Sequence, residues 1–254
     1  MKAAYARNRR GFTIIEVVLF LAITSLMMLG IFIGVSGALN RQIYEREVVS
    51  LVDFIQGQYS AVDNVRNNRP ADTRCDATGI QPSATSNHPG SSSCTGIGRW
   101  ITSNDDGSEL TSIPVYATAD IVAAETDDVS EAEYLSSINL TLPANPSLSD
   151  TMTHRVDAGD MYVNGDTSNT AFSMLIVKLP LSGMTRTHLV DSSVDTPAEL
   201  LGHEDRNAEP LRLCIESGRF GAPQSTGVRI APAAGSVAGV QRIAASEMET
   251  QGCV

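Results

Sequence analysis

The longest apolar run of the chain lies near its amino terminus and contains a single charged side chain. From Phe12 to Leu39 the only ionisable residue is Glu16. The uncharged part, Val17 to Leu39, would span about 35 Å as an α-helix, against about 30 Å of bilayer hydrocarbon. The pattern therefore predicts one membrane-spanning helix.

After residue 39 the continuous apolar run gives way to helical spacing. Apolar side chains recur every three or four residues with charged residues between them, at Tyr44, Val48, Leu51, Val52, Ile55, Tyr59 and Val62. One helix from Phe12 to about Arg66 would be about 80 Å long. Its second half is expected to pack on a globular domain.

Beyond this helix the pattern predicts a loop followed by strands. Residues 70–98 are rich in Ser, Thr, Gly, Asn and Pro, which indicates a loop. Short apolar runs between turn residues predict strands at Trp100–Ile101, Ile113–Tyr116, Ala171–Leu179, Leu211–Ile215 and Val228–Ile230, with Phe172–Val177 as the best central strand. Ile138–Leu142 is a further strand candidate, and Ser130–Ser137 and Pro197–Leu201 are candidates for short helical turns.

The charged residues predict which side of the membrane each end of the predicted span faces. Four basic residues and no acidic residue precede it, namely Lys2, Arg7, Arg9 and Arg10. The positive-inside rule keeps this segment in the cytoplasm and sends the rest of the chain outward. The 254 residues have a formal charge of −11, and loss of those four cations would leave 14 basic against 29 acidic residues, a charge of −15. Such an acidic exterior argues against nucleic-acid binding by the bulk of the surface.

Glu16 needs a chemical explanation, because an ionisable group inside a membrane-spanning helix costs up to about 3 kcal/mol and usually marks a functional pairing. No cation follows it within a helical turn. Cleavage after Gly11 would create an amine on Phe12, and Glu16 could neutralise that amine in its own subunit or in a neighbouring one.

The residues Arg9-Arg10-Gly11-Phe12-Thr13-Ile14-Ile15-Glu16 resemble the amino-terminal motif of the type IV pilin and pseudopilin family. In that family a prepilin peptidase cleaves after a glycine and N-methylates the next residue, usually Phe, and a Glu stands at the fifth mature position. The resemblance implies cleavage between Gly11 and Phe12, methylation of Phe12, and a role for Phe12 and Glu16 in subunit assembly.

The resemblance also implies a fold and a division of the chain. The expected fold is α+β and pilin-like, with one long helix on an antiparallel sheet and a disulfide-bounded carboxy-terminal region. The expected segments are a leader (1–11), a transmembrane and filament-core half of the helix (12–39), an amphipathic half (40–69) and an extracytoplasmic globular domain (70–254).

Two simpler interpretations remain as alternatives. A secretory signal cleaved near Ser36-Gly37-Ala38 fits poorly, because the apolar run exceeds the usual signal core of about 7 to 15 residues and contains Glu16. A plain signal anchor would explain the charge bias and the span, but it leaves Gly11 and Glu16 unexplained.

The expected function is that of a structural subunit of a type IV pilus or a type II-secretion-like filament. The size of the domain and the absence of the mid-helix proline of major pilins, near Ile33 here, favour a minor pilin or pseudopilin. The implied partners are the prepilin peptidase and N-methyltransferase, other pilin subunits, the pilus assembly platform and the cytoplasmic membrane. The implied location is this membrane before assembly and an extracellular or periplasmic filament afterwards; the alternative is an adhesin or binding module tethered by an uncleaved anchor.

Four cysteines permit three disulfide connectivities. Sequence proximity favours Cys75 with Cys94 and Cys214 with Cys253, in agreement with the expected export to an oxidising compartment.

Enzymatic or metal chemistry is not indicated. The histidines His88, His154, His188 and His203 are scattered without a metal-binding pair or a nucleophile turn, and each is expected to be a surface or hydrogen-bonding residue. No catalytic residue, metal site or cofactor is therefore predicted. Loop calcium at residues 104–109 or 191–205 is the alternative, although neither stretch has the spacing of an EF-hand loop.

Overall fold

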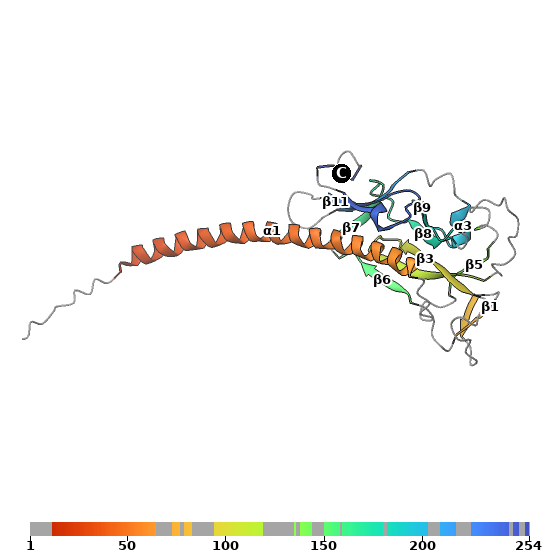
Figure 1. The fold of residues 1–254 in the computed structure, drawn as a ribbon. Coiled ribbons are helices and arrows are strands. Elements are labelled where there is room, and N and C mark those ends of the chain that lie inside the picture. The colour runs from red at the N-terminus through yellow and green to blue at the C-terminus, as the bar shows by residue number, and fades with distance from the viewer. Residues whose placement is uncertain are drawn as a thin grey trace, which may run out of the picture. The chain divides into compact units, whose positions relative to one another are not determined.

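The structure is a computed structural model, and it describes residues 12–64, 73–76, 79–82, 94–118, 135, 138–143, 150–157, 159–179, 182–202, 209–216, 225–243, 246–248 and 252–253. The chain divides into two compact units, residues 1–42 and residues 43–254. One long helix, α1, runs from Ile14 to Asp63 and contributes to both units (Figure 1). Its bounds confirm the predicted helix to within a few residues at each end.

The strands of residues 43–254 form antiparallel sheets, which makes the fold α+β as expected. A six-stranded sheet has the order β5-β4-β3-β8-β9, with β6 also paired to β4. A four-stranded sheet has the order β12-β11-β10-β7, and β1 pairs with β2. The bounds are β1 Thr73–Asp76, β2 Gly79–Pro82, β3 Thr95–Ser103, β4 Glu109–Ala117, β5 Leu140–Thr141, β6 Met152–Arg155, β7 Asp160–Val163, β8 Ser173–Lys178, β9 Thr185–Val190, α3 Pro197–Leu201, β10 Leu211–Glu216, β11 Ser225–Ile230, the 3-10 helix η4 Val237–Gly239, and β12 Val240–Ile243.

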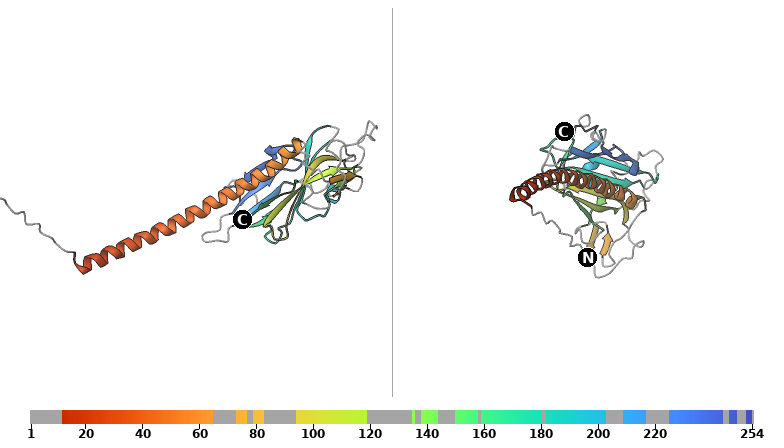
Figure 2. Two further views of the ribbon diagram at one scale, coloured as in Figure 1. Left: turned by 90° about the horizontal axis from the view of Figure 1, so that it is seen from below. Right: turned by 90° about the vertical axis from the view of Figure 1, so that its left-hand side faces the viewer.

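The carboxy-terminal half of α1 is part of the main core. Its apolar stripe is buried together with side chains of both large sheets, as the helical spacing predicted. The views of Figure 2 show this part of the helix, in orange, with the blue strands β10–β12 on one side and the yellow-green strands β3–β6 on the other. The helical members of this core are Tyr44, Val48, Leu51, Ile55, Tyr59 and Val62.

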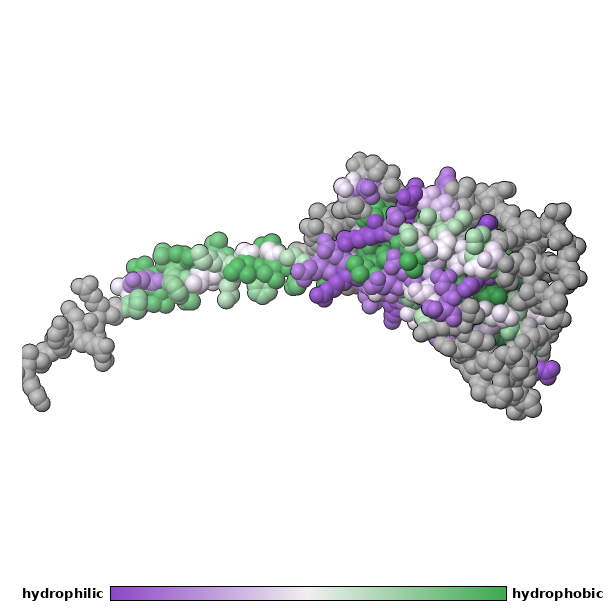
Figure 3. All heavy atoms as spheres, in the orientation of Figure 1, coloured by the Kyte–Doolittle hydropathy of each residue, from purple (hydrophilic) through white to green (hydrophobic). Residues whose placement is uncertain are grey.

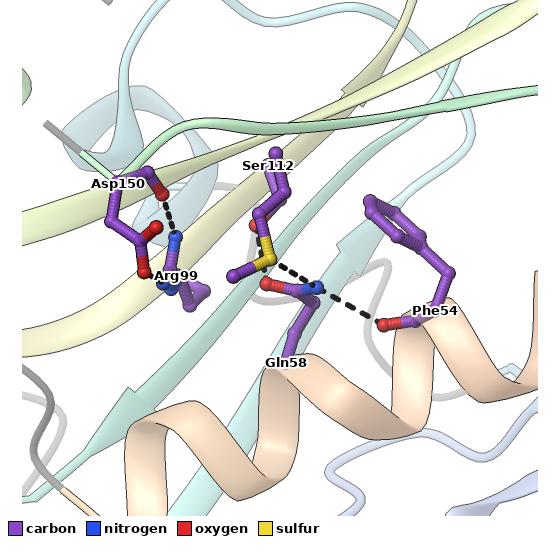
Figure 4. A network of polar contacts seen from close by, with 6 residues as sticks. Phe54, Gln58, Arg99, Ser112 and Asp150 are labelled. Atoms are coloured by element: carbon purple, nitrogen blue, oxygen red, sulfur yellow. Dashed lines mark hydrogen bonds and ion pairs between the residues drawn. The ribbon is translucent and has the colours of Figure 1, made fainter.

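Two glutamines of α1 bond to the two sides of this arrangement. The amide of Gln56 donates to the carbonyl oxygen of Val240, at the start of β12, over 3.1 Å. The buried amide of Gln58 accepts from the hydroxyl of Ser112 in β4 over 2.8 Å and donates to the carbonyl of Phe54 over 3.1 Å (Figure 4). Because the amide of Gln58 is satisfied inside the core, it fixes the rotation of α1 against β4 without a desolvation penalty.

A second apolar cluster covers the other face of the six-stranded sheet and includes Leu200 of α3. The buried guanidinium of Arg99, in β3, donates to the carboxylate of Asp150 over 2.8 Å and also to the backbone carbonyl of Asp150 (Figure 4). Both contacts satisfy a charge that would otherwise be costly to bury, so Arg99 secures the chain just ahead of β6.

The prediction of a loop over residues 70–98 is wrong in part, because β1, β2 and the start of β3 lie in this range. Ile80 is fully buried with Cys75, Cys94 and Tyr116 in a small cluster of its own. The buried side chains that this range contributes to the cluster are one isoleucine and the two cysteines of a disulfide. The sequence here therefore has no periodic run of apolar residues that would predict the strands.

The remaining strand predictions have mixed outcomes. β3, β4, β10 and β11 contain the predicted runs, and β8 lies within the predicted run Ala171–Leu179 and inside its sheet, as expected of a central strand. β5 is shorter than predicted, α3 matches the predicted turn, and Ser130–Ser137 lies outside the described residues except for Leu135. β6, β7, β9 and β12 were not predicted, because short strands with polar side chains give no clear period.

Candidate functional site

The amino-terminal end of α1 is capped by Thr13. The backbone N–H of Glu16 lies 3.1 Å from the carbonyl oxygen of Thr13 and 3.3 Å from its hydroxyl oxygen, and Val17 also donates to that carbonyl. A threonine that accepts from the third helical residue is a standard N-cap. The spacing Thr13-x-x-Glu16 is that of a capping box, a signal that can be found in the sequence itself.

This position gives Glu16 a local role beside the one implied by the family. Its carboxylate stands in the first turn of α1, where the exposed N–H groups and the helix dipole favour negative charge. Phe12 precedes the helix, and its side chain is 82% exposed. Gly11 lies outside the described residues. The cleavage, methylation and assembly roles of Gly11, Phe12 and Glu16 remain predictions.

The apolar part of α1 is not covered by any of the residues that the structure describes. Residues Ile14–Val35 form a helical segment long and apolar enough to cross a membrane, and none of it is buried. Figure 3 shows hydrophobic residues in green along this segment, with few polar residues among them. Large exposed side chains lie all around it, including Phe20, Leu26, Ile31 and Phe32. A helix that is apolar on every side requires lipid or other apolar helices around it.

The two hydroxyl side chains of this segment, Thr24 and Ser25, are satisfied within the helix. The hydroxyl of Thr24 donates to the carbonyl oxygens of Phe20 and Leu21, and that of Ser25 donates to Leu21 over 2.7 Å. Hydroxyls bonded to the preceding turn add little cost in hydrocarbon. A Cβ atom at Gly30 or Gly34 would meet nothing within 4 Å. After Glu16 this segment therefore suits an apolar environment.

The globular unit carries two disulfides, Cys75–Cys94 and Cys214–Cys253, with Cα–Cα distances of 5.8 Å and 5.5 Å. This is the pairing that sequence proximity favours. Cys214 and Cys253 are fully buried beside Tyr162, Ile243 and Met248. The second disulfide therefore fastens the end of the chain to β10.

The two described histidines are mainly buried and are not surface residues. His154 forms an ion-pair contact with Glu47 and stacks on Phe54. His188 lies in β9, where burial lowers its pKa to about 4, helped by the charge of Arg186. His88 and His203 lie outside the described residues.

The acidic stretches form turns in the described part of the chain. The carboxylate of Asp106 accepts from the backbone N–H of Ser108 over 2.9 Å, and this bond and the Ser108 hydroxyl lower the pKa of Asp106. In the second stretch, residues 191–205, the hydroxyl of Thr196 caps α3 by accepting a hydrogen bond from the backbone N–H of Glu199. Among the described residues no group of three or more His, Cys, Asp or Glu side chains could hold a metal ion.

An exposed apolar helix of membrane-spanning length, joined in sequence to a disulfide-bonded α+β unit, defines a protein that is anchored through its amino-terminal helix. Residues 6–32 match the prokaryotic N-terminal methylation motif, which is the signature of type IV pilins and pseudopilins. The motif supports a pilin-like substrate of prepilin peptidase, and it covers only the amino-terminal part of the chain. Comparison with curated proteins gave no match, and comparison with solved structures gave none either.

Proposed function

We propose that this chain is a minor pilin or pseudopilin of a type IV pilus or a type II-secretion-like filament. In this proposal the chain is cleaved after Gly11, N-methylated at Phe12, and held in the cytoplasmic membrane with residues 43–254 outside. The match of residues 6–32 to the methylation motif carries the proposal. The uncovered apolar surface of Ile14–Val35 supports it, because the same surface suits lipid before assembly and neighbouring helices afterwards.

Assembly would replace lipid contacts by contacts between apolar helices. Glu16 would neutralise the amine of Phe12 on an adjacent subunit and so set its axial register, because an unpaired carboxylate in this environment is costly. The platform that extracts the subunit from the membrane and the other subunits of the filament would be its partners. No cofactor takes part in this mechanism.

Intact mass with amino-terminal sequencing tests the processing step. The protein is recovered from cells that contain their own prepilin peptidase. A chain that begins at Phe12 and is about 14 Da heavier than the unmodified sequence is expected, because methylation adds one methyl group. A chain that begins at Met1 would instead support an adhesin with an uncleaved anchor, and one that begins near Leu39 would mean simple secretion.

Two substitutions of Glu16 separate charge pairing from helix capping. Glu16→Ala removes both the carboxylate and the capping-box side chain, whereas Glu16→Gln removes the charge and retains a residue suited to the capping box. Both variants should be cleaved normally and excluded from filaments. Wild-type incorporation of the Gln variant would show that capping is the role of Glu16, and Asp53→Asn supplies the control for loss of a carboxylate elsewhere in α1.

A further inference from the structure

Glu47 stands where α1 first enters the core of the globular unit. Tyr44 is the first buried residue of the helix in residues 43–254, and Val48, in the next turn, is completely buried. Between them the side chain of Glu47 is only 15% exposed. A carboxylate in the first turns of the packed helix is costly unless something neutralises it.

The neutralising group comes from β6. Nε2 of His154 lies 3.4 Å from Oε1 of Glu47, and the imidazole side chain is 12% exposed. The ring of Phe54 stacks on the imidazole at 5.3 Å between centroids and 25° between planes, which holds it in place. Among the described residues these two atoms have no hydrogen-bond partner of good geometry, so the ion-pair contact is their main compensation.

The charges around the pair disfavour a lone Glu47 carboxylate. Burial raises the pKa of Glu47, the charge of His154 lowers it, and the carboxylate of Asp157, in the loop after β6, raises it; the contact with His154 and a backbone hydrogen bond from Asp157 lower it, so that the net shift is upward. The chain just before β7 lies close to Tyr44, since a Cβ on Gly159 would lie 2.8 Å from the phenol oxygen of Tyr44. The charged groups that act on Glu47 are therefore His154 and Asp157.

We propose that the ion-pair contact of Glu47 with His154 is a pH-dependent clamp between the first packed turns of α1 and β6. With one proton the pair is neutral overall and the contact holds. When the proton is lost, a buried carboxylate faces a neutral ring and the carboxylate of Asp157, and the turns around residues 44–54 loosen from β6. The clamp would respond to the pH of the compartment outside the membrane, and it does not depend on filament assembly.

The sign of the effect follows from the raised pKa of Glu47. A group that binds its proton more tightly in the folded state stabilises that state at low pH, and this contribution is lost as pH rises above the ordinary value of 4.5. His188 acts in the opposite direction, because its pKa is lowered. The test therefore compares the unfolding midpoint of each variant with that of the wild type at the same pH. The pH dependence of the wild type alone would also include the contribution of His188.

The test uses the full chain in detergent micelles, with Glu47→Gln, His154→Gln and, as a matched control, Asp53→Asn on the same helix. Thermal unfolding midpoints are recorded from about pH 5 to about pH 8, the range in which free histidine side chains change charge. Hydrogen exchange of peptides covering residues 44–54 and 152–155, corrected for its intrinsic pH dependence, reports local opening. Peptides from residues 225–243 serve as the internal reference.

The clamp makes the two variants differ from the wild type in distinct ways at high pH. The midpoint of Glu47→Gln should rise relative to the wild type as pH increases, because this variant has no carboxylate to leave unpaired. The midpoint of His154→Gln should converge with that of the wild type toward pH 8, because both proteins then hold a Glu47 carboxylate that faces a neutral side chain. Exchange of residues 44–54 in the wild type should accelerate several-fold toward pH 8, and Glu47→Gln should abolish this change. Parallel midpoint curves for the wild type and both variants, or exchange in residues 44–54 that does not depend on pH, would overturn the proposal and leave a purely structural contact.

Discussion

The phenol oxygen of Tyr59 in α1 lies 2.7 Å from the hydroxyl oxygen of Thr187 in β9. The hydroxyl of Thr187 donates its only proton to the carbonyl oxygen of Ala234, also over 2.7 Å. Tyr59 must therefore be the donor of the first bond. The helix, the six-stranded sheet and the segment before β12 are joined by this short chain of buried hydrogen bonds.

Tyr59→Phe should lower the free energy of unfolding by about 1 kcal/mol, the usual net contribution of a buried hydrogen bond. Thr187→Val should cost more, since it leaves both the phenol of Tyr59 and the carbonyl of Ala234 without a partner. Chemical unfolding of the two single variants and the double variant measures the coupling. Strictly additive losses would contradict a connected chain.

The same pair predicts alkaline sensitivity. Burial raises the pKa of Tyr59 from 10.0 to about 12, so the folded state holds the phenolic proton more tightly than the unfolded state. The resulting stability is complete below pH 10 and is lost as pH rises toward 12. Unfolding curves between these values should fall more steeply for the wild type than for Tyr59→Phe, and identical slopes would exclude this assignment.

His188 predicts sensitivity to acid. Its lowered pKa, from 6.5 to about 4, means that protonation favours the unfolded state. The stability that it contributes is complete above pH 6.5 and is lost as pH falls toward 4. In register His188 is paired with Leu175 of the second apolar cluster, so His188→Phe should keep the packing and remove part of the acid sensitivity. The measurement is the unfolding midpoint of both proteins over this range.

Gly57 lies inside α1, where a Cβ atom would meet nothing within 4 Å. Gly57→Ala should raise the stability of the chain by about 1 kcal/mol, because alanine is the better helix former. Gly98→Ala is the contrasting variant and should destabilise, since its Cβ would collide with the carbonyl of Ile176. A filament assay completes the test: a stable Gly57→Ala subunit that assembles poorly would assign the glycine to contacts between subunits.

Each disulfide should stabilise according to the loop that it closes. The sequence separations are 39 for Cys214–Cys253 and 19 for Cys75–Cys94. Loop-closure entropy predicts losses of about 4 and about 3 kcal/mol when both cysteines of a pair are changed to serine. Chemical unfolding of the two double-serine variants measures which variant loses more free energy of unfolding. A larger loss from the shorter loop would show that burial of the sulfur atoms, and not loop closure, determines how much each disulfide stabilises the fold.

The long helix and its amino-terminal motif could be predicted from sequence because both depend on residues that are neighbours along the chain. An uninterrupted apolar run predicts a membrane-spanning segment, helical spacing predicts a buried stripe, and the residues around Gly11 and Glu16 form a motif of fixed spacing. The strands with strong apolar runs, such as β8 and β10, were found for the same reason.

Other features depend on contacts between residues far apart in sequence, so only the tertiary structure decided them. The burial of Ile80 depends on the meeting of β1 and β2 with Cys94 and Tyr116. The satisfaction of Gln58 by Ser112 and the approach of His154 to Glu47 require the six-stranded sheet to pack on α1. Local propensity contains no information on such pairings, because packing and desolvation select them once distant strands have met.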